Sequence, residues 1–175
     1  ELARRGAAVL LIDKARFPRY KVCGGCLNPR ALRVLHQAGL GHLVEKLRAV
    51  PLTRFQLGAR GAVARVPLPP GAGLSREALD TALVREAILA GAAFLPGVSA
   101  SLGPTTGPAD RRRLRLRQAG REQLVEGRIV LAANGLTGGL DEHATTEAEH
   151  DRPWEPGSRV GAGVMIAERA PGYEP

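Results

Sequence analysis

The hydrophobic and polar positions of the chain first indicate two strands of a parallel sheet. Residues 7–12 form a short apolar run that ends at Asp13 and Lys14. Residues 128–133 form a second run, which leads into the glycine-rich residues 134–139. Strands that are covered on both faces are almost continuously apolar and do not alternate. Both runs are therefore predicted to be buried strands of an α/β core, each followed by a polar turn.

Helix signals occupy two other parts of the chain. Asn28 is a capping residue type, Pro29 suits the first helical position, and the apolar positions that follow end at Gly39. Ser75 is placed to cap a second helix that ends at Gly91. We therefore predict one helix after each of these caps.

Two further stretches have the pattern of β-hairpins. Residues 50–70 contain two groups of spaced apolar residues that are separated by glycines. In residues 113–125, leucine first alternates with arginine. A turn near Gly120 follows, and the apolar residues Leu124 and Val125 lie after it. Residues 92–102 are predicted to be extended. The hairpins are expected to interrupt the α/β core.

The chain is predicted to contain one domain and the beginning of another. Residues 1–140 form the first domain, and the polar residues 141–156 form a linker. Residues 157–175 begin with small and apolar residues, like the first strand of a second, sheet-based substrate domain. Residues 1–6 have the pattern of the last turns of a helix closed by glycine, so we expect a strand and a glycine loop to precede them.

Composition narrows the class of protein. The 175 residues are 44% hydrophobic, and no apolar run approaches the roughly 18 residues of a membrane span, so we expect a cytoplasmic protein, with peripheral membrane contact left open. The net charge of +8 raises the question of nucleic-acid binding. Aromatic residues make up only 3% of the chain, however, and the basic residues are mostly scattered, so no nucleic-acid partner is predicted. Two cysteines do not form the disulfide framework of a secreted protein.

Asp13 is the first candidate ligand-binding residue. In a dinucleotide-binding βαβ unit, an acid at the carboxyl end of the second strand accepts hydrogen bonds from the adenosine ribose, roughly 20 residues beyond a glycine-rich turn. Asp13 has this position after its apolar run. The alternative is an ordinary aspartate that ends a strand. The glycine turn would precede Glu1, so Asp13 alone does not decide between the two.

Four sequence blocks occur together in an order that a known family shares. They are residues 2–14 (LARRGAAVLLIDK), 17–27 (FPRYKVCGGCL), 75–83 (SREALDTAL) and 130–135 (VLAANG). In these blocks the chain resembles the flavoprotein oxidoreductases related to geranylgeranyl reductases and to p-hydroxybenzoate hydroxylase-type (group A) monooxygenases. The resemblance implies FAD as cofactor and an α/β fold. That fold would be a partial Rossmann-like FAD/NAD(P)-binding domain, without its first strand and glycine loop, that carries inserted β-hairpins.

The resemblance also implies which residues contact the cofactor. Asp13 binds the ribose of FAD, and the loop through Cys23, Gly24 and Cys26 passes close to the flavin, where glycine allows close backbone approach. Arg76 contacts FAD, and its guanidinium suits phosphate, although a solvent-facing helix arginine is the alternative. The remaining residues of the predicted cofactor site are Lys14, Ala100 (through its backbone), Asn134 and Gly135.

The chain departs from the family pattern in two places. Where the monooxygenases usually have Asp-Gly, this chain has Asn134 and Gly135, so a role that needs a carboxylate is in doubt there, although Asn still hydrogen-bonds. The family's later Gly-Asp segment has no counterpart before Pro175. We therefore expect the chain alone to bind FAD weakly.

Cys23 and Cys26 leave three interpretations open: a redox-active disulfide, half of a zinc site, or a loop that lines the flavin. A structural zinc site needs about four ligands, and no second CxxC or close histidine pair is present. The pair precedes a helix, as a reactive thiolate requires. The flavin loop is favoured, with Cys23 as the candidate reactive residue. Other catalytic residues are unknown, and no metal is predicted.

These expectations together predict a FAD-dependent oxidoreductase in which the flavin performs the redox chemistry. The predicted reaction is reduction of C=C bonds in a hydrophobic, prenyl-like small molecule, with NAD(P)H as the electron donor. An aromatic monooxygenase that uses FAD and NAD(P)H is the first alternative. A nicotinamide-binding dehydrogenase domain and a non-catalytic basic binding module are the others.

Overall fold

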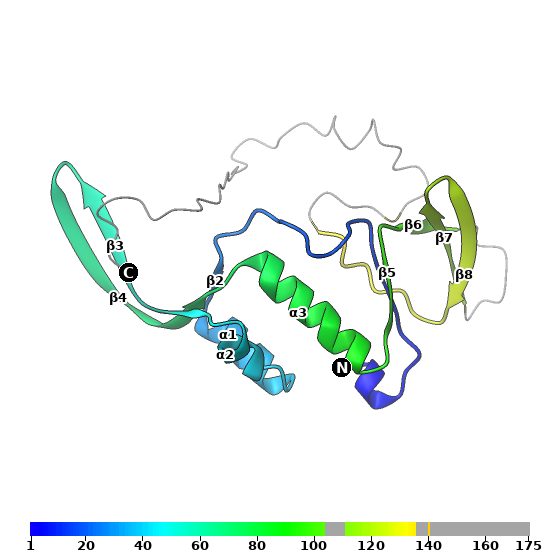
Figure 1. Ribbon diagram of the computed structural model, residues 1–175, viewed down its shortest axis with the longest axis horizontal. Coiled ribbons are helices and arrows are strands. Elements are labelled where there is room, and N and C mark those ends of the chain that lie inside the picture. The colour runs from blue at the N-terminus through cyan, green and yellow to red at the C-terminus, as the bar shows by residue number, and fades with distance from the viewer. Residues whose placement is uncertain (104–110, 136–139, 141–175) are drawn as a thin grey trace.

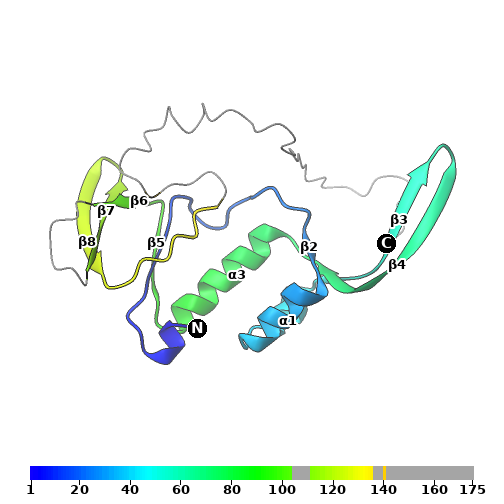
Figure 2. The same cartoon turned by 180° about the vertical axis from the view of Figure 1, so that it is seen from behind.

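The computed structural model describes residues 1–103, 111–135 and 140. Helix α3 (Arg76–Leu89) runs through the middle of the molecule (Figure 1). The parallel strands β1 (Leu10–Asp13) and β5 (Ala93–Pro96) lie beside its carboxyl end. A long hairpin extends from its amino end, and a second antiparallel sheet lies at the far side of the molecule. The view from behind shows the same order (Figure 2).

Strands β1 and β5 confirm that the chain mixes helices with a parallel sheet. They pair in register from Leu10 opposite Ala93 to Asp13 opposite Pro96, and the N–H of Val98 continues the ladder to the carbonyl of Asp13 at 3.1 Å. The prediction that this strand is buried on both faces is wrong for the described residues, because Leu10 is 42% exposed. Burial on both faces needs chain packed on each side of the sheet, and within the described residues β1 belongs to a sheet of only two strands.

Residues 128–133 do not form the second buried strand that the apolar run predicts. No strand is present there, and the side chains of Ile129 and Leu131 are 79% and 73% exposed. An apolar run becomes a strand only when another strand accepts its backbone hydrogen bonds, and the described residues provide none. The turn that follows begins with Gly135 at φ +86°, while residues 136–139 lie outside the described part of the chain.

Both predicted helix caps are confirmed. Asn28 precedes α1 (Pro29–Gln37) and accepts a hydrogen bond from the N–H of Ala31 at 2.9 Å. Ser75 precedes α3 and accepts one from the N–H of Ala78 at 3.1 Å. The structure adds α2 (His42–Lys46), which the sequence did not predict because five residues are too few to show a helical period.

Both predicted hairpins are also confirmed. The first consists of β3 (Val50–Ala59) and β4 (Ala62–Gly73), and the short strand β2 (Cys26–Leu27) adds to it in the order β2-β4-β3. In the second, β7 (Arg112–Gln118) pairs with β8 (Arg121–Gly127), and β6 (Ser99–Leu102) pairs with the other edge of β7. The predicted extended segment 92–102 is thus divided between β5 and β6.

Little of the described chain is deeply buried. The buried apolar residues are Leu43, Ala72, Leu79, Ala92, Val98 and Leu116. At the amino end, a short 3₁₀ turn, η1 (Ala3–Arg5), is closed by Gly6 at φ +81°. None of the helices in the described ranges is both long and apolar enough to span a bilayer. The predicted linker 141–156 and the segment 157–175 lie outside the described residues, so the division into domains stays a prediction.

Candidate cofactor site

The carboxylate predicted to bind a ribose lies at the carboxyl end of a parallel strand. Asp13 is the last residue of β1, and its Oδ1 accepts a hydrogen bond from the N–H of Ala15 at 2.8 Å. This local turn fixes the carboxylate where α/β proteins bind their ligands, beyond the ends of the strands. The Asp13 side chain is 27% exposed, so a ligand can reach it. Lys14, next in the chain, is exposed.

Arg19 connects Asp13 to helix α3. Its Nη2 lies 3.4 Å from Asp13 Oδ2 and 3.5 Å from Asp80 Oδ2. Its guanidinium also lies 5.1 Å from the centre of the Phe17 ring, a distance at which a cation is attracted to the ring face. The Phe17 ring packs edge-on against Phe94 of β5, with 5.4 Å between ring centres. Arg19 is therefore held between two acids and an aromatic ring.

Arg76 is the first residue of α3 and is bound by an acid one turn later. Its Nε and Nη2 donate hydrogen bonds of 2.9 and 3.0 Å to the two carboxylate oxygens of Asp80. Two parallel bonds fix the plane of the guanidinium as well as its position. The hydrogen bond to Asp80 raises the pKa of Arg76 above its usual value, against the opposing effect of burial, and Cys23 contributes in the same direction.

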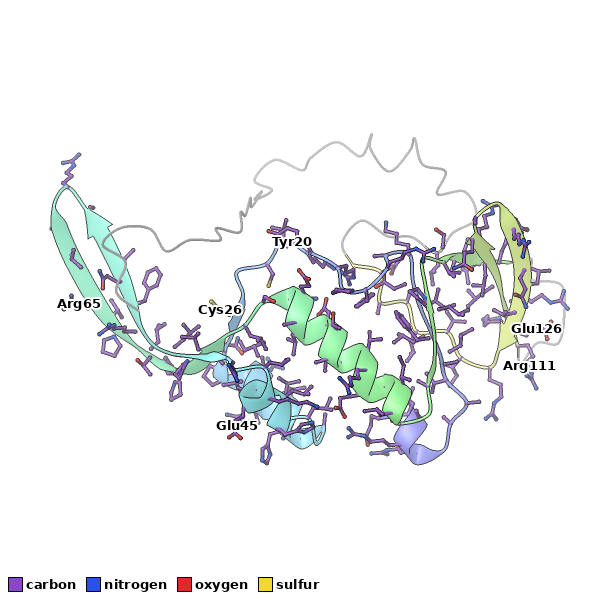
Figure 3. All side chains as sticks on the ribbon, in the orientation of Figure 1. Tyr20, Cys26, Glu45, Arg65, Arg111 and Glu126 are labelled. Atoms are coloured by element: carbon purple, nitrogen blue, oxygen red, sulfur yellow. The ribbon has the colours of Figure 1, made fainter. Side chains whose placement is uncertain are left out.

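The cysteine-containing loop lies at the amino end of α3. Cys23 lies near enough to the Arg76 guanidinium to raise its pKa, so this loop is beside the helix start. Cys26 belongs to β2, pairs with Gly73 of β4 and donates a hydrogen bond from its Sγ to the Gly24 carbonyl at 3.1 Å. Figure 3 shows Cys26 and Tyr20 on the segment that passes over this end of α3. Both cysteines are exposed free thiols.

The other predicted contact residues lie around these groups. Asn134 and Gly135 are exposed, and a Cβ added to Gly135 would lie 3.7 Å from Nζ of Lys21, so this turn is next to the cysteine loop. Ala100 lies in β6, where it is half-buried opposite Leu116 of β7. The structure thus brings Asp13, Cys23 and Arg76 into one connected site. It places Ala100 on the neighbouring sheet.

Two residues of the site were not predicted. Asp80 and Arg19 join Asp13 to Arg76, and we refer to these four residues as the acid–arginine network. Asp80 follows Arg76 by four positions, a helical spacing at which opposite charges meet, so the sequence did contain a signal for this pair. Arg19 had none, because its contacts with Asp13 and Asp80 depend on how the loop folds over α3.

The residues of this site fit FAD. A carboxylate suits ribose hydroxyls and a guanidinium suits a pyrophosphate. The Nε of Arg19 is buried and makes no hydrogen bond within the described structure, so it has donor capacity left over. A Cβ on Gly24 would have no atom within 4 Å, which leaves open space at the loop for a ligand.

A cavity of about 460 Å³ lies near this site, between α2 and α3. Leu43, Leu47 and Ala78 contribute apolar surface to its lining, and Arg85 contributes charge. None of the four residues of the acid–arginine network lines this cavity, although Ser75, which precedes Arg76, does.

Comparison with known sequences finds similarity to a menaquinone reductase. The chain is 40% identical over 103 residues to a menaquinone reductase of Mycobacterium tuberculosis. The match covers 56% of this chain but only 25% of the relative, so the matched part spans about a quarter of the relative's length. No protein-family model matches the chain.

Solved structures extend the comparison to the fold. A flavoprotein/dehydrogenase from Cytophaga hutchinsonii has a TM-score of 0.59 and 20% identity, and the match covers 73% of this chain and 33% of that one. The p-nitrophenol 4-monooxygenase of Pseudomonas putida has a TM-score of 0.61 and 12% identity, over 71% of this chain and 34% of the other. Flavin-dependent halogenases, a class that the sequence did not indicate, are also similar. The chain therefore has the fold of the flavin-dependent monooxygenases and halogenases, which confirms its resemblance to flavoprotein oxidoreductases.

Proposed function

We propose that the chain forms part of the FAD-binding site of an oxidoreductase. The observation that carries this proposal is the acid–arginine network. A ribose acid at the end of β1 and a phosphate-binding arginine at the start of α3 are joined there by direct ion pairs. Two of the similar solved structures, a flavin-dependent monooxygenase and aklavinone-11 hydroxylase, are complexes with FAD.

Each group of the site has a defined task in this proposal. Asp13 accepts hydrogen bonds from the adenosine ribose, while Arg76 and Arg19 neutralise the pyrophosphate. Cys23 and Gly24 would contact the flavin part of the cofactor, since glycine allows close backbone approach. Bound FAD supplies the hydride chemistry, which no side chain of the protein performs. The chain's own residues bind the cofactor and fix its orientation.

The reaction we propose is reduction of a C=C bond in a hydrophobic, prenyl-like substrate. The 40% identity to a menaquinone reductase supports it, since menaquinone carries a polyprenyl chain. Reduced nicotinamide is the proposed electron donor. Saturation of one double bond consumes a hydride from the donor and a proton from water or an acidic group.

Aromatic hydroxylation is the second candidate. The similarity in fold to p-nitrophenol 4-monooxygenase and to aklavinone-11 hydroxylase favours it. A hydroxylase would consume one oxygen molecule for each reduced flavin and leave one oxygen atom in the product. A reductase does not use oxygen.

A single-turnover experiment distinguishes these reactions. The purified flavoprotein is reduced with NADPH or NADH, and menaquinone is added without oxygen. After any menaquinol has been reoxidised to the quinone, a product that is still heavier by two hydrogens in its prenyl chain, in proportion to the flavin, supports the reductase. An unchanged menaquinone, together with hydroxylation of an aromatic substrate when oxygen is admitted, supports the monooxygenase. Failure of both nicotinamides to reduce the flavin would reject the proposed donor.

A further inference from the structure

The acid–arginine network alternates in charge from β1 to α3. Asp13 contacts Arg19, Arg19 contacts Asp80, and Asp80 contacts Arg76, at N–O distances between 2.9 and 3.5 Å. The residues come from a strand end, a loop and a helix. The network therefore connects the predicted ribose contact with the predicted pyrophosphate contact across three separate segments.

Asp80 is the least exposed member of the network. Its side chain is 14% exposed, against 21% for Arg19, 27% for Asp13 and 33% for Arg76. Charged groups interact more strongly when they are removed from water, so the central carboxylate has the largest electrostatic effect on its neighbours. The exposed ends of the network, Asp13 and Arg76, are the groups available to a ligand.

Asp80 makes more ionic contacts than an acid that pairs only with an arginine on its own helix. An exposed pair four residues apart contributes little to stability and involves a single helix. Asp80 forms such a pair with Arg76, but its Oδ2 also lies 3.5 Å from Nη2 of Arg19, on a loop that is far away in the sequence. One carboxylate oxygen therefore lies between two guanidinium groups, which would repel each other without it.

We propose that Asp80 is a positioning residue for the ADP half of FAD, an inference that rests on the proposed FAD-binding function. Its carboxylate holds the Arg76 guanidinium in one plane toward the pyrophosphate. It also shares Arg19 with Asp13, so the Arg19 charge does not act on Asp13 alone and the Asp13 carboxylate can still accept the ribose hydroxyls. If Asp80 loses its charge, Arg76 loses its orientation and Arg19 pairs with Asp13 alone, so both contacts with ADP weaken.

The test compares FAD with ADP, which contains the adenosine and both phosphates but no flavin. Equilibrium titration of the flavin-free protein measures both dissociation constants in wild type and in Asp80→Asn. We expect the substitution to weaken both ligands by the same factor, about tenfold, which corresponds to ~1.4 kcal/mol. Glu77→Gln is the matched control, because Glu77 is an exposed acid on the same helix, outside the network. It should change neither constant.

Asp80→Glu tests the geometry while it keeps the charge. The longer side chain displaces the carboxylate relative to Arg76 and Arg19, so the affinity for both ligands should fall between wild type and Asp80→Asn. This variant also decides the matter if Asp80→Asn does not fold. Wild-type affinity of Asp80→Glu for both ligands would then overturn the proposal.

The outcomes separate this inference from the proposed function. A wild-type protein that binds neither FAD nor ADP rejects FAD binding itself. A wild-type protein that binds both, together with an Asp80→Asn variant that binds them equally well, rejects only the positioning role. A variant that loses FAD but keeps ADP at full affinity also rejects it, because the effect would then lie on the flavin side.

Discussion

Nη2 of Arg19 lies 3.4 Å from Oδ2 of Asp13, although the two residues belong to a loop and a strand. The second oxygen of the same carboxylate accepts the N–H of Ala15. The acid that the sequence predicts as the ribose ligand is thus held at both oxygens before any ligand is added. Such preorganisation lowers the entropy cost of binding. The charge of Asp13 is therefore the first property to test.

Asp13→Asn should weaken FAD binding about tenfold or more, because hydrogen bonds to a charged group are worth roughly 1.5–3 kcal/mol. Asparagine has nearly the same shape, so the loss would report the missing charge. Quenching of flavin fluorescence on titration of the flavin-free protein measures the dissociation constant. Glu45→Gln on α2 is a suitable control, since Glu45 lies outside the network (Figure 3). Equal affinities of Asp13→Asn and wild type would contradict the ribose role.

Ser75→Ala should both destabilise the protein and weaken FAD binding. Loss of a serine cap costs typically ~1 kcal/mol, and here the cap fixes the first turn of the helix that begins with Arg76. Asn28→Ala removes the cap of α1, which carries no network residue, so it should reduce stability by a similar amount and leave FAD affinity unchanged. Urea unfolding measures the first effect and flavin titration the second. The prediction fails if both variants change FAD affinity equally.

Cofactor binding should protect Cys23 from alkylation. Cys23 is an exposed free thiol in the loop assigned to the flavin, so iodoacetamide should modify it readily in the flavin-free protein. We expect saturating FAD to slow this modification several-fold. Mass spectrometry of the tryptic peptide that contains both cysteines measures the rate at each one. A Cys23 rate that does not change with FAD would place the flavin elsewhere.

The features predicted correctly from the sequence depend on neighbouring residues in the chain. The caps at Asn28 and Ser75 and the turn near Gly120 are local, because a side chain bonds a backbone group a few residues away or a glycine permits a positive φ. The burial expected for the run 128–133 failed for the opposite reason. Burial depends on which segments lie alongside, and an apolar run does not specify them.

The candidate site likewise contains residues that the local sequence indicates and residues that it does not. Asp13 could be proposed because an acid directly after an apolar strand has a known position, and Arg76 because its sequence block resembles that of the flavoprotein family. Arg19 could not, since nothing in its local sequence indicates that it reaches both Asp13 and Asp80. Residues that link two predicted contacts can be identified only when the folded structure of the loop between them is known.

The measurement that tests FAD binding most directly is the visible absorption spectrum of the purified full-length protein, recorded before and after incubation with FAD and removal of the free cofactor. We predict that the protein shows the absorption bands of bound flavin, with a stoichiometry of one FAD per chain. Asp13→Asn and Asp80→Asn should lose bound flavin under the same conditions. A folded protein that stays colourless and retains no FAD after incubation would contradict the proposed function.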